Sequence, residues 1–258
     1  MTTDQRKVAL VTGAAKRIGR VIALALADCG WDVIVHFRTS GEDAALTVRA
    51  IEQRGQRAVA LQCDLASEID VRALVPAASA AIGADARLCC VVNNASLFAQ
   101  DSVDDFSQAQ LDAHMRANLV APILLAQALH AATPDGAQSV VINLLDQKLF
   151  NLNPDYLSYT LSKAALHTAT TMLAQALAPK LRVVGIAPGI TLVSGDQSAA
   201  GFAAAHTVTP LGRSSTPEDI AAAVCYVADA RAMTGTTLIV DGGQHLIPLQ
   251  RDVMFIAT

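Results

Sequence analysis

The sequence has little charge, few aromatic side chains and no paired cysteine motif. Only 16% of its 258 residues are charged and 4% are aromatic, and the formal net charge is -4. Such a chain offers no electrostatic attraction to nucleic acid or to an anionic membrane. Its five cysteines lack CxxC spacing, and an odd number argues against a disulfide framework. The composition therefore argues against a nucleic-acid-binding protein and a disulfide-stapled secreted domain.

Long apolar runs are also absent. Although 52% of the residues are hydrophobic, no uninterrupted run approaches the ~20 residues that a membrane span needs. The first residues lead directly into a short apolar segment, so no signal peptide is visible. We expect a cytoplasmic protein that binds neither membrane nor nucleic acid. No metal site is expected, because five histidines have no ligand-like spacing with acids or cysteines: His114, His130, His167, His206 and His245.

What the sequence does contain is a regular alternation of strand-like and helix-like segments. Strands are expected at residues 7–12, 32–37, 58–63, 88–92, 139–144, 181–186 and 237–240. Helices are expected at residues 19–29, 42–54, 68–81, 107–131, 156–177 and 217–228. Repeated βα units with apolar strands predict a parallel sheet that helices cover on both faces. We predict one α/β domain over residues 1–258, a doubly wound Rossmann fold of about seven strands. An irregular stretch rich in Gly, Ser and Ala, residues 191–210, is expected to be a mobile substrate loop.

A glycine-containing turn joins the first strand to the first helix. It reads Thr12-Gly-Ala-Ala-Lys-Arg-Ile-Gly19. In this place main-chain N–H groups and the helix N-terminus can hold the pyrophosphate of a dinucleotide. Arg17 adds a long cation that can contact a phosphate or project into the active site. Arg38 directly follows the second strand, near Lys16, His36 and Ser40, and a guanidinium pairs strongly with phosphate.

Further along the chain, a tyrosine and a lysine have the spacing of a proton-transfer pair. Tyr159 and Lys163 stand at i and i+4, so they share one helical face. Lys163 and the positive ring of an oxidised nicotinamide both favour the phenolate, so we expect a lowered pKa for Tyr159. Tyr156 lacks this spacing from Lys163 and is interpreted as a packing or rim residue.

These segments stand in the order typical of one large enzyme family. The turn at Thr12, Asn93-Asn-Ala95, Asn118, Tyr159 with Lys163, Pro188-Gly189 and Asp241-Gly-Gly243 together resemble the short-chain dehydrogenase/reductase family over residues 6–246. The resemblance implies that Asn118 holds a helix kink and a proton-relay water. It implies that Lys163 binds the nicotinamide ribose, that Thr191 meets the carboxamide, and that the protein is a homotetramer.

The resemblance also indicates the cofactor. Where NAD-using members carry an acidic residue, this sequence has Phe37, so nothing there repels a 2′-phosphate, and we predict NADPH. Asp64 is expected to accept from the adenine amino group. The predicted cofactor contacts are Gly13, Lys16, Arg17, Ile18, Gly19, His36, Phe37, Arg38, Ser40, Asp64, Leu65, Asn94, Ala95, Ser96, Tyr159, Lys163, Pro188, Gly189 and Thr191.

One position departs from the family pattern. Asp146 stands where the family has a serine that donates to the ketone oxygen. An ionised aspartate cannot donate, and it would repel the developing oxyanion. Either Asp146 is protonated, or the substrate is not a simple ketone. A carboxylate suits an N–C–N substrate such as a reduced pterin, whose C=N bond takes hydride on carbon and a proton on nitrogen. Lys148 is a candidate partner for Asp146.

The departures match one subgroup. The sequence is similar to pteridine reductases, which share the TGAAKR turn, Asn-Asn-Ala-Ser and the aspartate, and its tail Asp241–Leu246 resembles bacterial dihydromonapterin reductases. The similarity implies that Phe98 stacks on a pterin, that Ser96 bonds pterin or phosphate, and that Arg17 bridges the two.

The sequence thus predicts an NADPH-dependent reductase of a dihydropterin such as dihydrobiopterin or dihydromonapterin. Asp146, Tyr159, Lys163 and Asn118 are the predicted catalytic residues, and Arg17, Ser96, Phe98, Asp146 and Tyr159 the predicted substrate contacts. Two alternatives stay open. One is a carbonyl or 3-oxoacyl reductase with a protonated Asp146. The other is a non-catalytic NADP(H)-binding regulatory protein.

Overall fold

Seven parallel strands form the centre of the protein. The computed structural model describes residues 5–193, 199–207 and 209–255. The strands are β1 (Arg6–Val11), β2 (Asp32–Phe37), β3 (Ala58–Gln62), β4 (Ala86–Asn93), β5 (Ser139–Leu144), β6 (Leu181–Pro188) and β7 (Thr237–Val240). They lie in the order β3-β2-β1-β4-β5-β6-β7, and each neighbouring pair is parallel. The predicted Rossmann-like sheet is confirmed.

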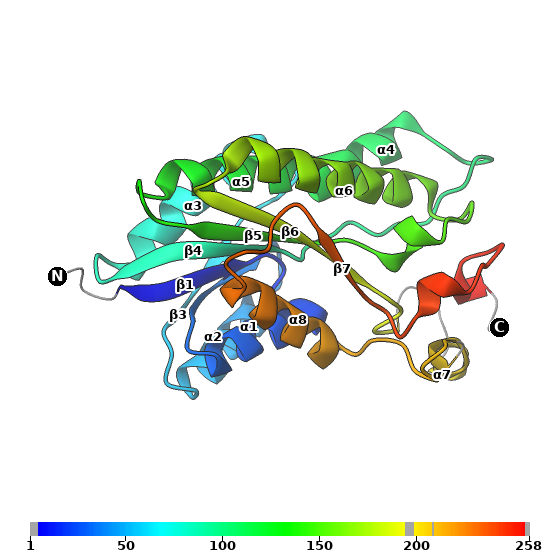
Figure 1. Cartoon of the computed structure of the whole chain (residues 1–258), viewed down its shortest axis with the longest axis horizontal. Helices are drawn as coiled ribbons and strands as arrows, with labels where there is room; N and C mark the ends of the chain where they lie inside the picture. The colour runs from blue at the N-terminus through cyan, green and yellow to red at the C-terminus, as the bar shows by residue number, and fades with distance from the viewer. Residues whose placement is uncertain (1–4, 194–198, 208, 256–258) are drawn as a thin grey trace.

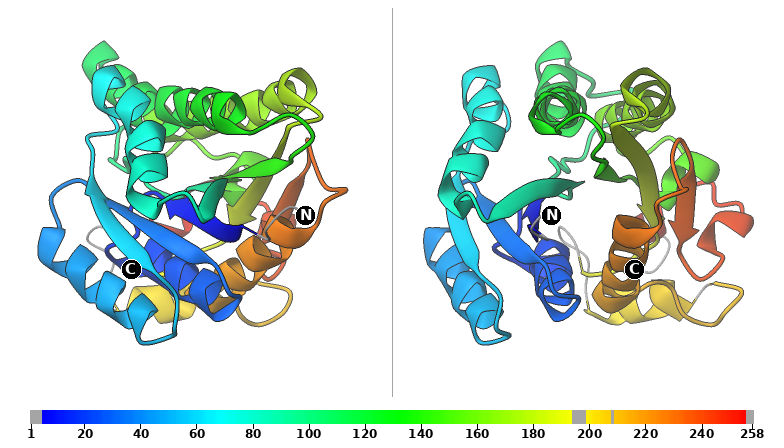
Figure 2. Two further views of the ribbon diagram at one scale, coloured as in Figure 1. Left: turned by 90° about the vertical axis from the view of Figure 1, so that its left-hand side faces the viewer. Right: turned by 60° about the vertical axis from the view of Figure 1, so that its left-hand side comes forward.

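Helices cover both faces of this sheet (Figures 1 and 2). One layer holds α1 (Arg17–Asp28), α2 (Gly41–Glu52) and α8 (Pro217–Asp229). The other holds α3 (Glu68–Ile82), α4 (Gln108–Met115), α5 (Ala121–Ala132) and α6 (Leu157–Leu177). In the described part of the chain, none of the helices is long and apolar enough to cross a bilayer.

Alternate strand residues supply two separate apolar cores. Val33 and Val35 of β2 pack with α1 and α8, whereas Ile34 packs with α3 and α5 on the other face. Successive side chains of a strand point to opposite faces, so a strand covered on both faces is apolar throughout. This explains why the strands could be predicted from continuous apolar runs.

Two segments differ from the sequence prediction. The helix expected over residues 107–131 is divided by a π-helical turn, Arg116–Val120, between α4 and α5. The stretch 191–210 contains a helix, α7 (Ala199–Thr207), which fits its alanine content because alanine has the highest helix propensity. Residues 194–198 and 208 of the predicted mobile loop lie outside the described residues.

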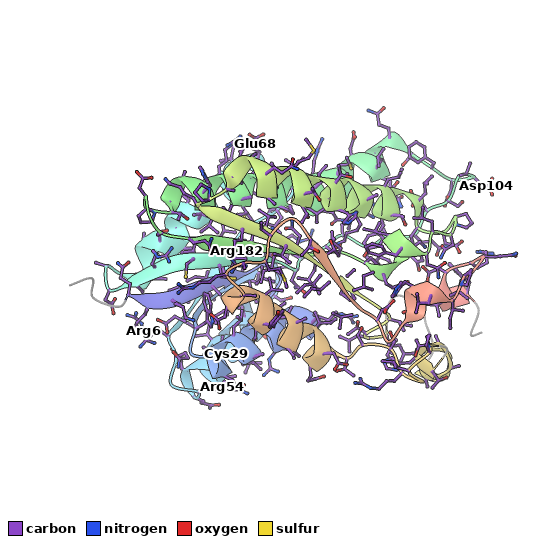
Figure 3. The ribbon with its side chains drawn as sticks, viewed as in Figure 1. Arg6, Cys29, Arg54, Glu68, Asp104 and Arg182 are labelled. Atoms are coloured by element: carbon purple, nitrogen blue, oxygen red, sulfur yellow. The ribbon has the colours of Figure 1, made fainter. Side chains whose placement is uncertain are left out.

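The strand order determines where a ligand can bind. The chain winds outward from β1 toward β3 and from β4 toward β7, so the direction reverses between β1 and β4. In open parallel sheets a crevice forms beyond the carboxyl ends of the strands at this switch point. Figure 3 labels Arg6 at the amino end of the sheet and Asp104 beyond the carboxyl end. The candidate site lies at the carboxyl end of the sheet.

Candidate active site

The glycine turn after β1 is closed by tight backbone contacts. Gly13 has φ +65°, a conformation that favours glycine. A Cβ at Gly19 would fall against the Gly13 carbonyl oxygen and the Asn94 amide. Glycine at both positions therefore lets the first turn of α1 lie directly on the end of β1.

Arg17 occupies this turn in an unusual backbone conformation. Its φ is +53°, which costs a residue with a Cβ about 1–2 kcal/mol. Its guanidinium donates from Nη2 to the Val193 carbonyl at 2.9 Å, and the residue lines the central cavity. The strained backbone places a cation at the cavity wall, as its predicted phosphate and substrate roles require.

The N-terminus of α1 fits an anionic group such as a pyrophosphate. Its N-cap, Lys16, does not cap the helix with its side chain and pairs instead with Asp43 at 2.8 Å. By contrast, Thr216 and Asp219 form a complete capping box at the start of α8. The N-cap side chain does not cover the start of α1, where main-chain N–H groups and the helix dipole favour negative charge.

Hydrogen bonds join the carboxyl ends of β1 and β4. The Thr12 hydroxyl accepts from the main-chain N–H of Asn94 at 2.9 Å and of Ala95 at 3.0 Å. The Asn94 amide donates back to the Thr12 carbonyl at 2.8 Å. The turn and the Asn-Asn-Ala-Ser segment are therefore held together as one wall, with Asn94 and Ser96 lining the cavity.

His36 supports the turn from beneath. It is buried, its Nδ1 accepts from the Gly13 N–H at 3.0 Å, and its Nε2 lies 3.1 Å from the Cys63 carbonyl. This arrangement requires a neutral ring protonated on Nε2, and burial lowers the pKa of His36 in the same direction. His36, which was predicted to contact the cofactor, thus lies behind the glycine turn, and its ring holds the turn in place. Phe37 packs against the apolar core on the α1 and α8 side of the sheet.

The predicted 2′-phosphate and adenine contacts lie around the ends of β2 and β3. Arg38 and Asp64 line one hollow there, and Ser40 precedes α2 as its N-cap. One oxygen of Asp64 accepts from the Ala66 N–H at 3.0 Å, so this carboxylate also stabilises its own turn. Leu65 packs against the core under α3.

Tyr159 and Asp146 form the chemical centre of the cavity. The Tyr159 hydroxyl donates to Oδ2 of Asp146 at 2.8 Å, and Oδ1 of Asp146 accepts from the Lys148 N–H at 2.8 Å. Burial, followed by the charge of Asp146, raises the pKa of Tyr159 well above its ordinary value. Burial also raises the pKa of Asp146, against the two hydrogen bonds. The expected lowering of the Tyr159 pKa is therefore reversed in the protein alone, and the pair is biased toward retaining protons.

Lys163 stands beneath this pair. Its ammonium donates to the Leu144 carbonyl at 2.7 Å and lies 5.8 Å from the centroid of the Tyr159 ring. Burial lowers the pKa of Lys163 to about 8, with the charge of Asp146 opposing. The lysine therefore carries a costly charge at neutral pH.

Asn118 lies within the π-helical turn and contacts the β4 loop. Its Oδ1 accepts from the Leu97 N–H at 2.8 Å and the Ser96 hydroxyl at 3.2 Å, and its amide donates to the Ser162 hydroxyl at 3.0 Å. Single π-helical turns within α-helices occur frequently at functional sites, and this one carries the residue that contacts the β4 loop. Asn118 thus ties Ser96 to the helix that carries Tyr159, and its predicted water relay stays a prediction.

The predicted stacking residue, Phe98, already belongs to an aromatic group. Its ring stacks on Tyr156 with centroids 4.4 Å apart and meets the Tyr159 ring edge-on at 4.7 Å. Phe98 is 40% exposed, whereas Tyr156 is buried, which agrees with a packing role for Tyr156. Phe98 therefore presents a supported aromatic surface to the cavity.

These residues enclose a cavity of about 280 Å³. Of the predicted residues it brings together Arg17, Ile18, Asn94, Ser96, Phe98, Asp146, Tyr159, Lys163, Pro188, Gly189 and Thr191. The sequence did not identify Leu144, Leu145, Gln147, Lys148, Ile190, Leu192, Gln244, Asp252 and Val253 as lining residues. Leu144 and Leu145 could have been found from their place at the end of a strand. Asp252 gave no such signal.

Within the described residues, no cluster of three or more His, Cys, Asp or Glu side chains is arranged to hold a metal ion.

Comparisons with known proteins agree with this arrangement. A family model described as enoyl-(acyl carrier protein) reductase matches residues 13–245. The chain is 34% identical to an uncharacterized oxidoreductase of Methylorubrum extorquens, over 94% of this chain and 99% of that protein. It is 33% identical to 3beta-hydroxysteroid dehydrogenase 1 of Eggerthella lenta, over 94% of this chain and 95% of that protein. The fold is similar to the crystal structure of FolM alternative dihydrofolate reductase 1 from Brucella canis complexed with NADP. The TM-score is 0.86 with 38% identity, over 96% of this chain and 97% of that one.

Proposed function

The chain belongs to the short-chain dehydrogenase/reductase family, and on that premise we propose that it reduces a C=N bond of a pterin. It is an NADP-dependent reductase, as its structural neighbours with bound NADP are. The pterin is the part of the assignment that depends on the site.

One observation carries the proposal. The Tyr159 hydroxyl donates to Asp146, which stands where the family pattern has a serine. A carboxylate next to the proton donor opposes negative charge on a ketone oxygen, whereas it accepts N–H groups of a nitrogen-rich ring. Phe98 adds an aromatic surface to the same cavity, on which a flat ring can stack.

The geometry suits a separate role for the cofactor and for each residue of the cavity. When bound, NADPH supplies the hydride. The turn at Gly13–Ile18 and the N-terminus of α1 fit its pyrophosphate, and Lys163 lies beneath the reacting end of the cavity. Tyr159, kept protonated by burial, donates the proton to ring nitrogen. Asp146 accepts an N–H of the substrate, and the phenolate that the transfer leaves on Tyr159 takes up a proton from solvent.

A structural neighbour lends support. The Brucella canis protein is described as an alternative dihydrofolate reductase, and dihydrofolate contains a dihydropterin ring. Substrates with this ring are therefore the first to test.

NADPH oxidation by the purified protein tests the proposal. It should be measured with dihydrobiopterin, dihydromonapterin and dihydrofolate, and separately with a panel of ketones. We expect turnover of at least one dihydropterin. Turnover of ketones alone would remove the pterin assignment and leave the reductase.

A second candidate is a carbonyl reductase in which Asp146 is protonated. The observation in its favour is the burial that raises the pKa of Asp146, because a neutral carboxyl can donate to a ketone oxygen. Under this hypothesis the rate of ketone reduction falls steeply as Asp146 ionises, and Asp146→Ser restores the rate at high pH. Under the pterin hypothesis Asp146→Ser lowers turnover of the pterin.

A homotetramer is part of the proposal. Apolar side chains of the α4–α6 layer, among them Val120, Leu161 and Met172, are exposed in the single chain. Light scattering coupled to gel filtration tests the expected mass of four chains, and a monomer would contradict it.

A further inference from the structure

Lys148 is a buried lysine with two contacts of different kinds. It belongs to the short 3-10 turn Gln147–Phe150 that follows Asp146, and it is 3% exposed. Its main-chain N–H donates to Oδ1 of Asp146 at 2.8 Å. Its ammonium donates to Oδ2 of Asp252 at 2.9 Å and to the side chain of Asn153 at 2.5 Å. One residue thus connects the Asp146 carboxylate to a carboxylate near the end of the described chain.

The residues around Asp252 are fastened to the same loop. Residues 247–255, here called the C-terminal segment, lie beyond the carboxyl end of the sheet (Figure 1). The Ile247 carbonyl accepts from the Asn151 amide at 2.6 Å. The Asp252 N–H donates to Asp155 at 2.7 Å. Each partner lies a few residues after Asp146, so the C-terminal segment and the loop from residue 147 to 155 form one unit.

Aromatic rings extend this unit to the substrate side of the cavity. The Phe255 ring lies 6.1 Å from that of Tyr156 at an interplanar angle of 28°. Tyr156 in turn stacks on Phe98, and the Lys148 ammonium lies 5.4 Å from the Tyr156 centroid. Asp252 and Val253 themselves line the cavity. The C-terminal segment is therefore a wall of the site.

We infer that Lys148 and Asp252 are a pair of positioning residues that fix the Asp146 carboxylate for the reaction. A buried ammonium needs a partner, because an unpaired charge is costly away from water. Without Asp252 the Lys148 side chain turns toward solvent and draws the 3-10 turn with it, and Asp146 loses its backbone donor. The inference rests on the proposed role of Asp146.

The titration of Asp146 reports on the Lys148–Asp252 pair, because the groups around Asp146 change its pKa. Tyr159 and the Lys148 N–H donate to it, Lys163 lowers its pKa, and the charge of Asp252 raises it. Losing the Asp252 charge alone would lower the Asp146 titration midpoint, whereas losing the Lys148 N–H donor, the larger of the two influences, raises it. A displaced 3-10 turn therefore moves the titration of Asp146 to higher pH. A purely structural loss reduces activity or stability without moving that titration in a defined direction.

The test uses the full-length protein with Asp252→Asn, Lys148→Met and the double variant. Lys180→Met is the matched control, because it breaks the Lys180–Asp135 pair at the opposite end of the sheet. The Asp146 carboxyl carbon is followed by ¹³C NMR across pH and assigned by its loss in Asp146→Asn. Turnover, the KM for NADPH and the melting temperature are measured in parallel.

In Asp252→Asn we expect a higher Asp146 titration midpoint and about a tenfold loss of kcat, in line with the coupling of contacting pairs. The KM for NADPH stays unchanged. The double variant, which leaves no unpaired charge, loses no more activity than Asp252→Asn, and Lys180→Met behaves as wild type. An Asp146 midpoint that is unmoved or lower in Asp252→Asn, or a wild-type kcat in that variant, overturns the inference. A wild-type protein that turns over no pterin overturns the proposed function instead, and the titration still decides about the pair.

Discussion

The buried charge of Lys163 should reduce the stability of the protein at neutral pH. Burial lowers its pKa from 10.5 to about 8. Below about pH 8 both the folded and the unfolded chain bind this proton, and the folded state carries the full penalty of about 3 kcal/mol. Between the two values the unfolded chain binds more protons than the folded one. The free energy of unfolding contributed by this group therefore rises with pH.

Lys163→Met removes the titrating group and keeps most of the side-chain volume. The variant also loses the 2.7 Å hydrogen bond to the Leu144 carbonyl, which costs about 1–3 kcal/mol but does not depend on pH. We expect the wild type to gain about 2 kcal/mol relative to the variant between about pH 7 and pH 9.5. Urea unfolding of both proteins at the two pH values measures this difference, with Lys180→Met as a control at a half-buried lysine.

The result that refutes the reasoning is a wild-type-minus-variant difference that stays constant with pH. Such a result means that Lys163 keeps an ordinary pKa despite its burial. A difference that moves in the opposite direction refutes it equally, because the folded lysine would then be stabilised in its charged form.

Three further predictions concern the site. Tyr159→Phe removes the proton donor and should lower kcat by about 10²–10⁴-fold in steady-state kinetics. Fluorescence titration should show unchanged NADPH affinity, and equal losses in kcat and in NADPH affinity contradict the role of Tyr159 as proton donor. Phe98→Leu removes a stacking surface worth about 0.5–1.5 kcal/mol and should raise the pterin KM by roughly 2- to 10-fold, with the KM for NADPH as the internal control. His36→Leu leaves the Gly13 N–H without its acceptor and should weaken NADPH binding by about fivefold in calorimetry, the cost of one hydrogen bond; unchanged binding would show that the turn holds itself.

Local sequence patterns were sufficient to predict the sheet and the order of its elements. Both faces of each central strand are covered, so β5 consists entirely of buried residues and stands out as an apolar run. The helix expected over residues 217–228 begins at Pro217 in the structure, because its cap is formed by residues adjacent in sequence, Thr216 and Asp219. The position of the site at the carboxyl ends of the strands followed from the same βα alternation.

Features that depend on distant partners could not be predicted. Asn118 bonds to the β4 loop, which lies 21 positions before it, and Lys148 pairs with Asp252, which is 104 positions away. Lys148 was a candidate partner of Asp146, but it contacts that carboxylate through its backbone instead of its ammonium. Burial and the charge of Asp146 raise the pKa of Tyr159 in the protein alone, whereas the expected lowering included the charge of an oxidised nicotinamide. Spacing along a helix reveals neighbours on that helix and does not reveal desolvation.

The role of Asp146 is tested most directly by the ratio of kcat/KM for a dihydropterin to kcat/KM for a ketone, measured in the wild type and in Asp146→Ser. The account predicts that the ratio favours the dihydropterin in the wild type. It predicts that the ratio falls in Asp146→Ser, because a serine donates to a ketone oxygen and no longer accepts N–H from a pterin ring. A wild type that prefers ketones, or a ratio that the substitution leaves unchanged, would contradict the account.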